Sequence, residues 1–89
     1  MARRKVVICN KKGLHARAAS RLVQVASDYS AEVCLLFGDK QADGKNIMSV
    51  MMLAASMGTE VVLKAEGHDA ESALDALVQL IEDRFDEGE

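Results

Sequence analysis

The stretch DAESALDALVQLIEDRF, residues 69–85, is the most regular part of this 89-residue chain. Its apolar side chains recur every three or four positions, as they do along the buried face of an α-helix. Asp69 stands just before them, where an aspartate can accept the backbone N–H groups of a first turn. We therefore predict a helix that Asp69 caps. Its predicted core residues are Ala70, Ala73, Leu74, Leu77, Val78, Ile81 and Phe85.

Six further elements precede this helix. Short β-branched or alternating apolar runs predict strands, and apolar positions at helical spacing predict helices. The predicted strands are 5–10, 31–37, 40–43 and 60–67, and the predicted helices are 16–27 and 47–53. The order β, α, β, β, α, β, α gives too few strands for a barrel and too many for a helix bundle. We predict an α+β fold, in which an antiparallel sheet carries its helices on one face.

Length and composition restrict the protein class. A chain this short builds one core, so residues 1–89 are expected to form a single domain. Cys9 and Cys34 lie in apolar runs without a CxxC motif, which favours two reduced thiols and a cytoplasmic location. With two histidines and no ligand cluster, we expect no metal site. No apolar run is long enough to span a bilayer, so no stable membrane association is expected.

The charged residues are distributed unevenly along the chain. Residues 1–27 hold seven of the 11 lysines and arginines and none of the 14 acidic residues. A basic first third indicates an anionic group or an acidic protein surface as a partner. Nucleic acid is one such partner, but the acidic remainder and only three aromatic residues argue against nucleic-acid binding.

The segment GLHARAAS, residues 13–20, places His15 at the predicted start of a helix. A helix start offers free N–H groups and a partial positive charge, both of which favour a phosphate. Gly13 permits unusual backbone angles, and Arg17 can reach phosphate oxygens with its guanidinium. Small side chains at Ala16, Ala18 and Ala19 would leave room for another protein. This pattern suits a phosphohistidine, whereas hydrolysis would need a nearby carboxylate that the sequence lacks. A capping role for His15 is the alternative interpretation.

The segment GKNIMSVMMLAASMG, residues 44–58, predicts a second helix that Asn46 caps. Val50, Leu53 and Ala54 can face the core together. A second side then carries Ile47, Met48 and Met51, which indicates an exposed, adaptable protein-binding surface. Met52 and Met57 fit either the core or the surface.

With these motifs at this spacing, the chain resembles the histidine-containing phosphocarrier (HPr) family of the bacterial phosphoenolpyruvate-dependent phosphotransferase system. The resemblance rests on GLHARAA, on GKNIMSVMMLAASMGTEV and on GHDAESALDALVQLIEDRF, and covers essentially the whole length. It implies an open-faced β-sandwich, a four-stranded antiparallel sheet with three helices on one side. It also implies that Nδ1 of His15 accepts a phosphoryl group from phospho-enzyme I and donates it to a histidine of an enzyme IIA protein. Arg17 would stabilise the phosphate.

The same resemblance implies one docking surface for both partners. Its expected residues are Ala16, Ser20, Arg21, Gln24, Ile47, Met48 and Met51. The carrier is expected to be a monomer that needs no cofactor and is a substrate of phosphotransferases, not an enzyme. His68 is expected to have no functional role.

Two positions depart from the family pattern. Alanine stands at position 18 where proline is usual, and asparagine stands at position 46 where many members have a regulatory serine. Asn46 cannot accept that phosphate, although Ser49 is nearby. ARAA (residues 16–19) and RFDEGE (84–89) also resemble the nitrogen-related (NPr) branch, so both sugar uptake and regulation remain open. The alternative function is a regulatory protein-binding module with the same fold and no phosphoryl transfer.

Overall fold

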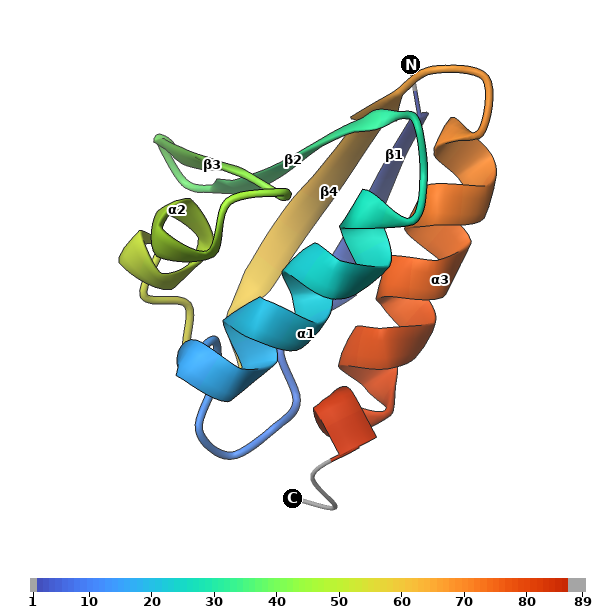
Figure 1. Ribbon diagram of the computed structural model, residues 1–89. Coiled ribbons are helices and arrows are strands. Elements are labelled where there is room, and N and C mark those ends of the chain that lie inside the picture. Colours follow the sequence, from blue (N-terminus) through green and yellow to red (C-terminus); the bar gives the residue numbers. More distant parts are fainter. Residues whose placement is uncertain (1, 87–89) are drawn as a thin grey trace.

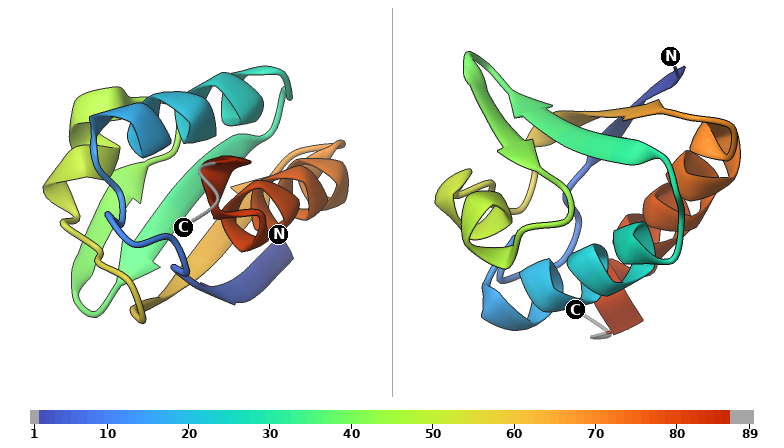
Figure 2. Two further views of the ribbon diagram at one scale, coloured as in Figure 1. Left: turned by 90° about the horizontal axis from the view of Figure 1, so that it is seen from below. Right: turned by 45° about the horizontal axis from the view of Figure 1, so that its top comes forward.

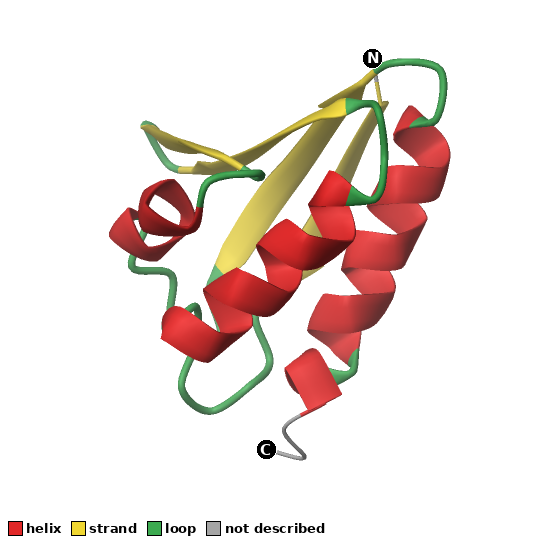
Figure 3. Cartoon of the chain, viewed as in Figure 1, coloured by secondary structure: helices red, strands yellow, loops and turns green. Residues whose placement is uncertain are grey.

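The structure is a computed structural model that describes residues 2–86. One four-stranded sheet is covered on one face by three helices (Figures 1 and 3). The strands are β1 (Ala2–Val7), β2 (Glu32–Phe37), β3 (Lys40–Asp43) and β4 (Glu60–Glu66). The helices are α1 (Ala16–Ser27), α2 (Ile47–Met52) and α3 (Ala70–Glu82), followed by the short 3₁₀ turn η1 (Arg84–Asp86). All neighbouring strands pair antiparallel in the order β1-β4-β2-β3, which confirms the predicted fold class.

The central strand β4 shows why one face of the sheet is covered. Its side chains alternate, so that Val61, Leu63 and Ala65 are buried beneath the helices while the residues between them face outward. Helix α3 packs across β1 and β4, and α1 lies beside α3. The core is almost entirely aliphatic, as the shortage of aromatic residues predicts.

The predicted first strand is displaced along the chain. We predicted residues 5–10, but β1 runs from Ala2 to Val7 because its partner β4 sets the register, with Ala2 opposite Ala65 and Val7 opposite Glu60. Beyond Val7 the chain enters a loop in which the apolar run continues. Asn10, the end of the predicted strand, is fully buried there.

Helix α3 has the predicted buried face, although Val78 is only partly buried. The predicted cap is wrong. The Asp69 side chain makes no capping hydrogen bond. It accepts the backbone N–H groups of Ser30 and Ala31, both at 2.8 Å, and so ties the β4–α3 turn to the α1–β2 loop. These two hydrogen bonds lower the pKa of the Asp69 carboxyl, and the bond from Ser30 has the larger effect.

Helix α2 begins as predicted, since the Asn46 side chain accepts the backbone N–H of Ser49 at 3.0 Å. Val50 and Leu53 are buried. Ala54, which we predicted to face inward with them, is exposed. The reason is that α2 ends at Met52, and Ala54 lies just beyond it in the left-handed region (φ 55°).

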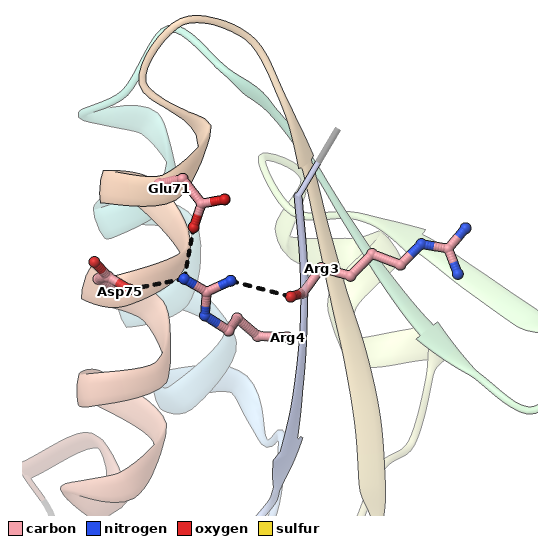
Figure 4. A network of polar contacts seen from close by, with 4 residues as sticks. All are labelled: Arg3, Arg4, Glu71 and Asp75. Carbon is pink, nitrogen blue, oxygen red and sulfur yellow. Dashed lines mark hydrogen bonds and ion pairs between the residues drawn. The ribbon is translucent and has the colours of Figure 1, made fainter.

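A polar network joins β1 to α3 on the surface (Figure 4). One nitrogen of the Arg4 guanidinium contacts Glu71 at 2.6 Å and Asp75 at 3.3 Å, and another donates to the Arg3 carbonyl at 3.1 Å. The pKa of Arg4 is raised, mainly by its hydrogen bond to the Glu71 carboxylate. The network thus uses one of the seven basic residues of the first third to join β1 to α3.

The two cysteines are free thiols, as predicted. The Cys9 thiol donates to the carbonyl of Ile81 at 3.1 Å, which links the loop after β1 to the end of α3. Within residues 2–86, no helix is long and apolar enough to cross a membrane.

Candidate functional site

His15 occupies the N-cap position of α1. Its backbone is extended (φ −75°, ψ 178°), and its carbonyl accepts the Ala19 N–H at 2.8 Å, which is the first hydrogen bond of the helix. The imidazole is half-buried and makes no capping hydrogen bond. The interpretation of His15 as a capping side chain is therefore wrong.

The N-terminus of α1 is suited to an anion. The helix is 12 residues long and has no acidic residue in its first turn, so no carboxylate of the helix competes for the N–H groups there. A phosphoryl group on the His15 ring would lie at the positive end of this helix.

Backbone contacts to a second loop hold His15 in this position. The N–H of Leu14 donates to the Ala55 carbonyl at 3.0 Å. Gly13 has a φ of +66°, and a Cβ there would lie 2.5 Å from the same carbonyl oxygen, so only glycine fits without a shift. The loop before His15 also has an internal hydrogen bond, in which the side-chain amide of the buried Asn10 donates to the Gly13 carbonyl at 2.8 Å.

Arg17 lies on the first turn of α1 and is exposed. Within residues 2–86, no hydrogen bond or ion pair holds its guanidinium, so the side chain can turn toward an incoming phosphate. Ala16 is also exposed, as predicted. Ala18 and Ala19 are fully buried core residues, which overturns our expectation that they leave room for a partner.

The predicted docking residues lie on two neighbouring helices. Helix α2 packs beside α1, near its beginning (Figures 1 and 2). On α1, Gln24 is exposed, and Ser20 and Arg21 are half-buried. On α2, Ile47 and Met48 are exposed by 41% and 66%, whereas Met51 is half-buried and packs against the core.

Sequence reasoning did not place Met52 and Met57. The structure exposes them by 74% and 60%. Helical spacing could not decide this, because α2 has only six residues and the chain after it follows no helical period. Both side chains therefore add to the exposed apolar surface of α2 and of the loop after it.

A histidine opens the first helix of a small α+β fold, beside an exposed apolar surface, and this arrangement suits a phosphoryl-group carrier. The chain belongs to the PTS-HPr family, whose family model, described as "PTS HPr component phosphorylation site", matches residues 2–83.

Curated relatives and solved structures agree with this assignment. The chain is 52% identical to the phosphocarrier protein HPr of Pseudomonas aeruginosa, over 94% of each chain. It is 44% identical to the phosphocarrier protein NPr of Shewanella violacea, over 94% of this chain and 92% of the relative. The crystal structure of HPr from Thermoanaerobacter tengcongensis superposes with a TM-score of 0.94 at 45% identity, covering 98% of each chain. The protein is thus a phosphocarrier of the phosphotransferase system and not a catalyst.

Proposed function

We propose that His15 is the residue that carries the phosphoryl group, and that Arg17 stabilises it. The observation that supports this most directly is the N-cap position of His15, at the positive end of α1. In this proposal Nδ1 attacks the phosphorus of phospho-enzyme I, and the bond from phosphorus to the enzyme I donor breaks as the new N–P bond forms. A histidine of enzyme IIA then takes the group in the same way.

The protein contributes position and charge to these transfers, and the partners complete the site. Gly13, Leu14 and Ala55 fix the loop, so the ring is presented with little rearrangement. Arg17 supplies a mobile positive charge for the phosphate oxygens. Because the half-buried ring lies at the surface, a second protein can reach the phosphoryl group.

The docking surface proposed for enzyme I and enzyme IIA lies on α1 and α2, next to His15. It comprises Ala16, Ser20, Arg21, Gln24, Ile47, Met48 and Met51. The exposed apolar side chains of α2 supply buried contact area, and the basic side chains of α1 favour an acidic partner surface. Residues 1–89 would act as one monomeric domain in the cytoplasm, with no nucleic acid, membrane or cofactor involved. Curated relatives carry both names, HPr and NPr, so the proposal concerns the step that both branches share.

The test is phosphorylation of the purified protein by phosphoenolpyruvate and enzyme I, followed by intact mass measurement. We expect one acid-labile phosphate on the native protein and none on His15→Ala. His68→Ala is the matched control, because His68 is the other histidine and lies before α3, away from the start of α1, and it should accept the phosphate normally. Arg17→Ala should slow the transfer.

Two results would contradict the proposal. Phosphate on His15→Ala would place the acceptor elsewhere. No phosphate on the native protein, with an enzyme I that phosphorylates its own carrier in the same tube, would favour the regulatory-module alternative.

A further inference from the structure

Exposed large apolar side chains are concentrated in one segment of the chain. Within residues 2–86 they are Val7, Ile47, Met48, Met52 and Met57. Four of these five lie between residues 47 and 57, and three of the four are methionines. Three thioethers are thus open to solvent in a protein whose other large apolar side chains are mostly buried.

Two of these three methionines, Met48 and Met57, lie on segments next to the loop that holds His15. Met48 lies on α2, which packs beside α1. Met52, one helical turn further along α2, lines a pocket with Lys40 and Gln41 of β3. Met57 follows Ala55 by two residues, and the Ala55 carbonyl accepts the N–H of Leu14, next to His15. Met51 differs, because it is half-buried against the core.

We propose that Met48, Met52 and Met57 are oxidation sites, and that oxidation of Met48 and Met57, beside the His15 loop, weakens partner docking. The proposal rests on the proposed function, since it concerns the surface beside His15. In the reaction, a thioether sulfur donates an electron pair to one peroxide oxygen. The O–O bond breaks, the sulfur keeps one oxygen as a sulfoxide, and the other leaves as water. Each sulfoxide replaces a soft apolar contact by a polar, chiral group.

The reaction should be selective and should leave the fold intact. The three exposed side chains are open to the oxidant, whereas Met51 is partly covered by the core. Because each of the three residues is at least 60% exposed, their oxidation removes little buried contact. The damage should therefore appear as weaker binding to enzyme I, with the chemistry at His15 retained once the complex has formed.

The experiment uses hydrogen peroxide on the full chain, followed by thiol reduction so that Cys9 and Cys34 return to the free state. Peptide mass mapping should show sulfoxide at Met48, Met52 and Met57 well before Met51. Thermal unfolding should remain unchanged. In phosphoryl transfer from enzyme I, the oxidised chain should show a KM raised by about tenfold with little change in kcat. Methionine sulfoxide reductases A and B together should restore the original KM.

A variant with Met48→Leu, Met52→Leu and Met57→Leu provides the second measurement. Its KM is compared only with its own value before peroxide, and peroxide should not change it. An unchanged KM in the fully oxidised native chain would overturn the proposal. A peroxide-induced rise of equal size in the leucine variant would also overturn it, because the loss would then arise elsewhere. Absence of phosphate on the untreated chain would instead contradict the proposed function. Peptide mass mapping would still test whether Met48, Met52 and Met57 are oxidised first.

Discussion

The backbone N–H of Leu14 donates to the carbonyl of Ala55 at 3.0 Å, and this bond joins the loop before His15 to the loop after α2. The loop after β1 makes two more bonds nearby, from Ile8 N–H to the Thr59 carbonyl (2.9 Å) and from Gly58 N–H to the Ile8 carbonyl (2.7 Å). Two segments more than 40 residues apart in sequence therefore set the position of one histidine. The site depends on the fit between two loops as well as on helix α1.

Gly13→Ala should disturb this fit. A Cβ at position 13 would lie 2.5 Å from the Ala55 oxygen and 2.9 Å from the Ser56 Cα, in a left-handed conformation that disfavours alanine. Strain and overlap together should lower the free energy of unfolding by at least about 2 kcal/mol. Phosphoryl transfer to His15 should slow as well, because the loop must move. Urea unfolding and transfer kinetics measure the two effects.

Gly38→Ala is the matched control for that change. Gly38 has a similar φ of +61°, but a Cβ at this position would have no other atom within 4 Å. Only the conformational cost remains, so the expected loss is about 1 kcal/mol with normal phosphoryl transfer. An equal loss of unfolding free energy in the two variants would show that the close contact between position 13 and Ala55 is unimportant.

The sequence allowed the position of His15 to be predicted because the signal is local. The helical pattern that follows His15 depends on residues 16–27 alone, and α1 has the predicted bounds. The contact of the preceding loop with Ala55 could not be predicted in this way. The limits of β1 could not be predicted, because its partner strand lies more than 50 residues away and sets the register. The role of Asp69 was missed for the same reason. Local rules assign it to the helix that follows, but its partners Ser30 and Ala31 are brought near only by folding.

The Asp69 contacts predict a dependence of stability on pH. The pKa of this carboxyl is below its ordinary value of 3.8, mainly because the charged form accepts the N–H of Ser30. Asp69 therefore stabilises the protein fully above pH 3.8, and this contribution is lost as the pH falls through the lower pKa of the folded state. Asp69→Ala should melt at a lower temperature than the native protein at pH 7.

The difference in melting temperature between native and Asp69→Ala proteins should shrink as the medium becomes more acidic than pH 3.8. Asp69→Asn keeps one oxygen acceptor and should fall between the two at pH 7. A difference that is constant down to the acid limit would show that the charge of Asp69 contributes nothing.

Ala54→Gly should stabilise the protein. Ala54 follows the C-cap of α2, and its N–H donates to the Met51 carbonyl at 3.0 Å with a φ of 55°. Glycine is the residue that this position favours after a helix. Relief of the left-handed strain should exceed the entropy cost of glycine and raise the free energy of unfolding by about 0.5 kcal/mol. Ala54→Val should lower the free energy of unfolding, and an increase for the valine variant would contradict this explanation.

Phe85 is the last large side chain of the core, and its loss should be costly. It is only 2% exposed, although its backbone and that of Arg84 are both left-handed (φ 55° and 56°). Burial of the ring therefore compensates for two unfavourable backbone conformations at the end of α3. Phe85→Ala should lower the free energy of unfolding by about 3–5 kcal/mol, as measured by urea denaturation. Phe37→Ala, which removes a half-buried ring from β2, is the control and should cost clearly less. Equal losses would mean that Phe85 packs no better than the half-buried Phe37.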